Sequence, residues 1–148
     1  MPDREDELVA AVGKASEALE YVERARGHLY SLHQLIGRAD FLFEEAAHML
    51  DELGEGEVAE HLRADIVGRN LLDGRWTFQI VEEFEALYWE TVRAAVRGLE
   101  EQYCDGRRHL HEARMKEERR TRGRPGHERR PVPEPAVNRR AGSAADTG

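Results

Sequence analysis

The sequence has few of the residues that cross-link a chain, interrupt its helices or carry it into a membrane. It contains one cysteine, which excludes an internal disulfide or a zinc ribbon. The positions from Asp3 to Arg124 contain no proline, which permits long helices. No apolar run approaches the roughly 18 residues that cross a bilayer, and the start of the chain lacks the apolar region of a signal peptide. We therefore expect a cytoplasmic protein without a membrane partner.

Charge and apolar content divide the chain into two parts. The formal net charge of the 148 residues is -8, but residues 1–105 carry -14 and residues 106–148 carry +6. Of the 31 Leu, Ile, Val and Phe residues, only Val132 and Val137 lie beyond position 110. We therefore predict an acidic helical domain at 1–106, a basic helical extension at 107–122 and an extended or disordered tail at 123–148.

A repeat of seven residues runs through the first third of the chain. It places one stripe of mostly apolar residues on a helix that starts after Asp3 and ends before Gly54. The stripe consists of Leu8, Val12, Ala15, Leu19, Val22, Arg26, Leu29, His33, Ile36, Asp40, Phe43, Ala47 and Leu50. The repeat leaves open whether 8–50 is one helix or two that meet near Gly27.

Two further helices follow in the prediction, a short one at 57–67 and a long one at about 75–103. The inward positions of the long helix are predicted to be Val81, Phe84, Tyr88, Val92, Ala95 and Leu99. The predicted fold class is all-α: an antiparallel hairpin of long helices, or a small helical bundle, with a basic C-terminal extension. An elongated hairpin exposes much of its stripe, so we expect self-association, most simply as a dimer.

Three polar residues interrupt the stripe at intervals of seven: Arg26, His33 and Asp40. Buried polar groups need partners, and seven residues separate neighbours by about 10 Å along a helix. The partners must therefore come from another helix or another subunit, where Glu82, Glu83 and Glu85 are the obvious carboxylates. Three interpretations stay open: register-setting interhelical pairs, a functional site, or solvent exposure. The functional version is a polar pocket or metal site formed by His33, Asp40, Glu44 and Glu83.

The sequence contains few groups that could carry out catalysis. The chain has three serines, none in a nucleophile elbow, and no glycine-rich nucleotide loop. Cys104 has arginines nearby that could lower its pKa, but no placed base. The chain holds one Glu-x-x-His, at Glu45 to His48, where a di-iron bundle needs two, and a His-x-His pair at His109 and His111. The sequence therefore does not favour an enzyme, and we expect no cofactor.

The clearest short motif, Arg122-Gly123-Arg124-Pro125, lies where the basic extension meets the tail. It resembles the AT-hook, in which a glycine lets the backbone enter the minor groove of DNA and arginines lie along its floor. The predicted nucleic-acid contacts are Arg119, Arg120, Arg122, Gly123, Arg124, Pro125, Arg129 and Arg130. The competing interpretation is a solvated charged segment, or one that docks on the acidic domain.

Several stretches resemble a family of small uncharacterised helical proteins of bacteria and archaea. They are residues 21–30, Gly68-Arg69-Asn70, residues 74–79 and residues 116–130. The similarity spans most of residues 20–130 and implies that the segment from Gly123 to Glu128 is a fixed part of the protein. No activity is transferred by this resemblance.

The sequence thus favours a non-enzymatic helical interaction or scaffold protein that associates with itself. The first alternative is a protein that binds nucleic acid, or an acidic protein, through residues 107–130. The second is a helical protein that binds a metal or small ligand.

Overall fold

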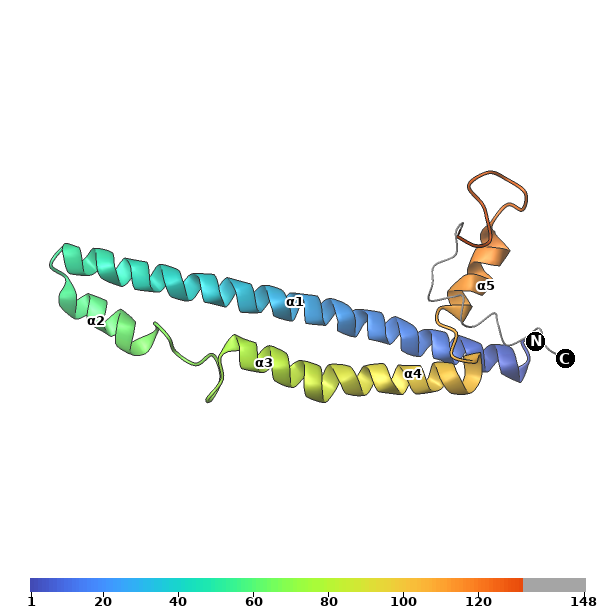
Figure 1. The fold of residues 1–148 in the computed structure, drawn as a ribbon, viewed down its shortest axis with the longest axis horizontal. Helices are drawn as coiled ribbons and strands as arrows, with labels where there is room; N and C mark the ends of the chain where they lie inside the picture. The colour runs from blue at the N-terminus through green and yellow to red at the C-terminus, as the bar shows by residue number, and fades with distance from the viewer. Residues whose placement is uncertain (132–148) are drawn as a thin grey trace. The chain divides into compact units, whose positions relative to one another are not determined.

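The computed structural model describes residues 1–131, and in that range the protein is built from helices (Figure 1). They are α1 (Arg4–Glu52), α2 (Gly56–Asp65), α3 (Thr77–Glu83), the π-helical turn η1 (Phe84–Trp89), α4 (Glu90–Cys104) and α5 (Leu110–Arg119). Residues 1–131 contain no strand, only an isolated bridge between Leu72 and Arg75. The all-α prediction is confirmed. In this described range no helix is both long and apolar enough to cross a membrane.

The α1 segment is one helix of 49 residues, which settles the question at Gly27. The Asp3 carboxylate accepts a hydrogen bond from the Asp6 backbone N–H at 2.9 Å and so caps the first turn. At Gly27 the helix continues, and the Ser31 hydroxyl donates to the Gly27 carbonyl at 3.2 Å. The helix ends before Gly54, whose φ of 81° is the left-handed conformation that glycine adopts readily.

The chain divides into two compact units. The first unit comprises Met1–Glu20 and the chain from Val92 onward. Its core is formed by Val9, Val12 and Cys104, with Leu99 and Leu110 packed against them. These side chains come from α1, α4 and the start of α5, so the first turns of α5 are part of this core.

The second unit, Tyr21–Thr91, has a much thinner core. Its buried apolar side chains are Ala47, Ala59 and Val81, joined by the buried Thr77. Large apolar side chains are instead exposed on α1, α2, η1 and the connecting segments. The buried apolar side chains of this unit are thus two alanines and a valine, which contribute little to the hydrophobic stabilisation.

The π-helical turn corrects the predicted inward face of the second long helix. Tyr88 was expected to face inward but is 54% exposed, and Ala95 is also exposed. Val96 and Glu100 are buried instead. A π turn places about one extra residue in the helix relative to an α turn, which rotates the buried position from Ala95 to Val96. The prediction was wrong at Tyr88 and Ala95, whereas Val81 is buried and Phe84, Val92 and Leu99 are partly buried.

The basic extension begins later than the sequence suggested. Between α4 and α5, Asp105, Gly106 and His109 have φ values of 52°, 70° and 57°, so this segment is a turn rather than the start of a helix. Helix α5 begins at Leu110 and ends at Arg119. Residues 121–131 contain turns and bends. The tail predicted at 123–148 lies outside the described residues from position 132 onward.

Candidate functional site

Arg26, the first polar position of the α1 stripe, is paired with Glu85 of η1 within the second unit. Glu85 Oε1 accepts hydrogen bonds from Arg26 Nε at 3.1 Å, from Arg26 Nη2 at 3.0 Å and from the Tyr30 hydroxyl at 2.5 Å. The Arg26 guanidinium also lies 3.8 Å from the centroid of the Trp89 ring, a cation–π contact. The hydrogen bonds from Tyr30 and Arg26 lower the pKa of the Glu85 carboxyl.

The other two polar positions also have partners on the returning chain. His33 Nδ1 lies 2.7 Å from the hydroxyl oxygen of Thr77, which is buried. Asp40 Oδ1 accepts a hydrogen bond from the backbone N–H of Gly68 at 2.8 Å. These contacts fit the interpretation in which the polar residues set the register between α1 and the chain that returns along it.

The remaining residues of the predicted polar pocket face other partners. Glu83 forms an ion pair with Arg75 at 2.6 Å, and that hydrogen bond lowers the pKa of the Glu83 carboxyl. Glu44 is exposed. In residues 1–131, the metal-type ligands that the structure gathers into a group of three include none of His33, Asp40, Glu44 and Glu83. The metal-site interpretation of these four stays a prediction.

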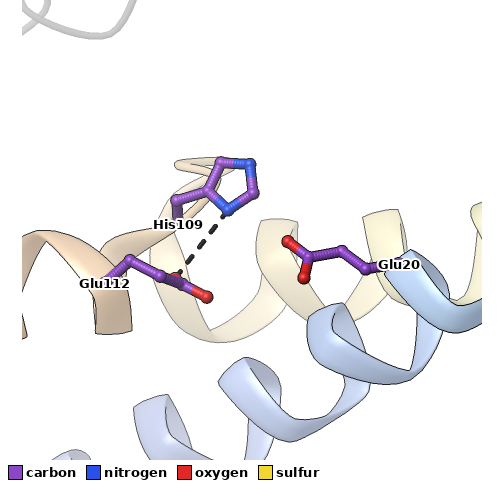
Figure 2. A group of neighbouring side chains, drawn as sticks. All are labelled: Glu20, His109 and Glu112. Carbon is purple, nitrogen blue, oxygen red and sulfur yellow. Dashed lines mark ion pairs between the residues drawn. The ribbon is translucent and has the colours of Figure 1, made fainter.

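A group that the sequence analysis missed lies in the first unit (Figure 2). Glu20 of α1, His109 of the α4–α5 turn and Glu112 of α5 each place one ligand-type atom within 4.8 Å of the others. His109 Nδ1 lies 3.8 Å from Glu112 Oε2. That oxygen is buried and has no hydrogen-bond partner in the described part of the chain. Figure 2 shows the Glu20 carboxylate turned toward the His109–Glu112 pair.

The His-x-His pair does not act as one unit. While His109 faces Glu112, His111 packs against α1, where its Cβ lies 2.9 Å from the position that a side chain at Gly13 would occupy. The sequence analysis singled out His109 as part of a His-x-His pair. In the folded chain, however, His109 lies near Glu20 and Glu112 and not near His111 as a second ligand.

The predicted nucleic-acid segment folds around one carboxylate. Glu117 Oε2 pairs with Arg120 Nε at 2.6 Å and with Arg129 Nε at 3.7 Å, and its Oε1 pairs with Arg122 Nη2 at 3.2 Å. The hydrogen bond from Arg120, helped by the other two charges, lowers the pKa of Glu117. Gly123 has a φ of 76°, so the AT-hook-like core turns back on itself in this structure.

The same loop borders an open hollow of about 770 Å³. Its lining is mainly basic and consists of Lys116, Arg119, Arg120, Gly126, His127, Glu128, Arg130 and Pro131. A hollow with this charge attracts anions. Arg124 and Pro125 of the predicted contacts are not among its lining residues.

Cys104 is not set up as a nucleophile. Burial raises the pKa of its thiol, and this effect exceeds the opposing influence of Arg107 and Arg114. The nearby arginines act in the expected direction, but burial outweighs them because the side chain lies in the core of the first unit.

Comparison with family models, curated proteins and solved structures finds no match to this chain. The resemblance to the uncharacterised helical family therefore stays a prediction, and the argument for function depends on the residues themselves.

Proposed function

We propose that this protein is a non-enzymatic helical interaction protein that works as a dimer of identical chains. One observation carries the proposal: α1 and Leu53 just after it carry a second apolar stripe, whose large side chains are exposed while Ala39 and Ala46 are half-buried. It consists of Leu32, Leu35, Ala39, Leu42, Ala46, Met49 and Leu53. Leu35, Met49 and Leu53 are 69%, 63% and 75% exposed. We call this set the outer stripe.

The spacing of the outer stripe is that of a coiled-coil seam. Its members are separated alternately by three and four residues, as are positions a and d of a heptad. Each of its members up to Met49 lies one residue before a member of the stripe identified in the sequence, which we call the inner stripe. Through His33 and Asp40, the inner stripe contacts the returning chain. One residue is about 100° around a helix. The two stripes thus give α1 two apolar faces: the returning chain contacts the inner one, where Ile36 and Phe43 are still 39% and 40% exposed, and the outer one is more exposed.

An antiparallel second copy fits the outer stripe best. If Ala39 of one chain is opposite Leu42 of the other, then Leu35 is opposite Ala46 and Leu32 is opposite Met49. Small side chains then face large ones at the central layers, which fills the seam. The same register places Arg38 beside Glu45 of the second copy on both sides of the two-fold axis, where opposite charges favour pairing.

A parallel pair fits less well. It stacks Ala39 on Ala39 and Ala46 on Ala46, which leaves gaps in the seam. It also places Arg38 next to Phe43 of the other chain rather than next to a carboxylate. Charge and volume therefore both favour the antiparallel arrangement.

Sedimentation equilibrium of the full chain at tens of micromolar tests the proposal. We expect a dimer mass and a melting temperature that rises with protein concentration. Leu35→Glu puts a charge in the seam and should weaken dimerisation at least tenfold. Gln34→Glu is the matched control, because it adds the same charge one residue away and outside the outer stripe. A monomer at tens of micromolar would refute the proposal.

A charge exchange tests the orientation. Arg38→Glu places two glutamates side by side in the antiparallel dimer and should weaken it, as should Glu45→Arg through two arginines. The double variant Arg38→Glu/Glu45→Arg restores opposite charges and should recover most of the lost affinity. A double variant that is as weak as the sum of the single variants would exclude the antiparallel register.

A second candidate function is binding of nucleic acid through the basic extension. The basic hollow bordered by Lys116, Arg119 and Arg120 favours a partner that carries phosphate. Fluorescence anisotropy with duplex DNA should then show an affinity that falls steeply with salt and is lost on removal of residues 107–148. Arg124→Ala should weaken A/T-rich duplexes more than G/C-rich ones. Binding that survives the truncation would refute this candidate.

A further inference from the structure

We infer that Glu20, His109 and Glu112 form a binding site for a divalent transition-metal ion, with Zn²⁺ as the ion that fits the donor set best. The three residues come from α1, the α4–α5 turn and α5, all within the first unit (Figure 2). This group is different from the one around His33 and Asp40. The inference does not depend on dimerisation.

The donor set identifies the class of ion. One imidazole nitrogen and two carboxylate oxygens are ligands that zinc accepts together. Mg²⁺ and Ca²⁺ prefer oxygen alone. Zinc bonds of about 2.0–2.2 Å place neighbouring ligand atoms roughly 3.3–3.5 Å apart. The atoms here lie within 4.8 Å of one another, and His109 and Glu112 are 3.8 Å apart. Small side-chain rotations close that difference.

An independent observation points to the same place. Glu112 Oε2 is buried and has no hydrogen-bond partner in residues 1–131. The Glu112 side chain as a whole is 39% exposed, but this one oxygen is shielded from water, and a shielded carboxylate oxygen without a hydrogen bond is costly. A metal ion bound between Glu112 and Glu20 supplies the missing partner and removes the repulsion between two nearby carboxylates.

Two arginines of the first unit that could neutralise the group are engaged elsewhere. Arg114 pairs with Asp6 at 2.7 Å, and Arg107 lies 3.6 Å from Asp105. The carboxylates of Glu20 and Glu112 therefore have no guanidinium partner from either of them. His109 supplies a positive charge here only when it is protonated, and a bound cation supplies one when the histidine is neutral.

The position of the site gives it a structural consequence. Helix α5 is already held to α1 by the Arg114–Asp6 ion pair and by the packing of His111 at Gly13. A metal bound to Glu20, His109 and Glu112 adds a third connection at the first turn of α5. Metal binding should therefore reduce the opening of α5, and with it the mobility of the basic extension.

Calorimetric titration of ZnCl₂ into the tag-free full chain, first stripped with a chelator, tests the inference. We expect one equivalent of Zn²⁺ per chain. His109→Ala, Glu20→Gln and Glu112→Gln should each lower the affinity at least tenfold. His28→Ala is the matched control, because it removes an exposed histidine of α1 outside the group, and it should leave the titration unchanged.

Hydrogen exchange provides a second readout on the same samples. Zn²⁺ should slow exchange of the amides of residues 110–119 several-fold in the wild type and leave them unchanged in Glu20→Gln. Glu20 is exposed, so that variant tests the site with little risk to folding. Failure of the wild type to bind stoichiometric Zn²⁺ at 100 µM would overturn the inference, as would unchanged affinity in Glu20→Gln.

Discussion

Arg26 and Glu85 are 59 positions apart in the sequence and are joined by two hydrogen bonds in the second unit. The pair is partly buried, Trp89 covers the guanidinium, and Tyr30 donates a third hydrogen bond to the same carboxylate oxygen. With the contacts of His33 and Asp40, it joins α1 to the returning chain at three turns. In a unit with so small a buried apolar core, we expect these polar contacts to specify the register.

The Glu85 interaction should weaken in acid. Because its folded pKa is lowered, its stabilisation is present above the ordinary carboxyl pKa of about 4.3 and is lost as the pH falls through the folded value. Glu85→Gln should therefore lower the free energy of unfolding at pH 7, and the difference from the wild type should shrink toward pH 3. Urea unfolding between pH 3 and 7 measures it.

The control for this experiment is Glu82→Gln on the same stretch of helix. Glu82 is exposed, so its substitution should have little effect at any pH. A Glu85→Gln difference that is as large at pH 3 as at pH 7 would show that the effect comes from packing and not from the carboxylate charge.

The contact between His33 and Thr77 allows a second test of the register. Thr77→Val keeps the shape of the buried side chain and removes its hydroxyl, so it should cost about 1 kcal/mol. Thr91→Val is the control, because the Thr91 hydroxyl donates only to the Leu87 carbonyl of its own helix on an exposed face. If Thr77→Val and His33→Ala were additive in a double-mutant cycle, the two residues would not be coupled.

Much of α1 could be predicted from the sequence because residues spaced alternately by three and four positions share one face when the chain is helical, although the repeat did not distinguish one helix from two. The inner stripe predicted that Arg26 needs a partner from another helix, and Glu85 was one of three carboxylates named. It could not predict that His33 would meet a hydroxyl and Asp40 a backbone N–H, since any polar group satisfies them.

Two features could not be predicted from the sequence pattern. The π turn at Phe84–Trp89 has no reliable local signal, because it depends on how the helix packs. The group at Glu20, His109 and Glu112 depends on a turn in which His109 adopts a positive φ. Ligands that come from three separate segments become neighbours only when the turn has been formed.

The packing of α5 on α1 predicts opposite effects for two glycines of the same helix. A Cβ at Gly13 would lie 2.9 Å from His111 Cβ, whereas a Cβ at Gly27 meets nothing within 4 Å. Gly13→Ala should therefore destabilise by about 1–3 kcal/mol, and Gly27→Ala should stabilise by about 0.5–1 kcal/mol. Chemical denaturation of both variants measures this. Equal effects would mean that α5 does not pack at Gly13.

The loop around Glu117 should open when that carboxylate is removed. Glu117→Gln takes away the negative charge that Arg120, Arg122 and Arg129 share. Trypsin should then cleave after Arg122 several-fold faster than in the wild type. Glu118→Gln is the control, because it removes the same charge at the next, exposed position. Equal cleavage in the two variants would show that Glu117 does not organise the loop.

The reactivity of the Cys104 thiol measures how well the core of the first unit is shielded from solvent. Burial raises the pKa of Cys104, which lowers the fraction of reactive thiolate at pH 8 and also blocks access of reagents. Labelling with a thiol-reactive disulfide at pH 8 should therefore be at least 100-fold slower in the native protein than in 6 M guanidinium chloride. Because Leu110 of α5 packs against this core, Gly13→Ala, which pushes α5 away, should speed labelling while Gly27→Ala does not. Equal labelling rates in native and denatured protein would contradict the burial of Cys104, and with it the docking of α5 on α1.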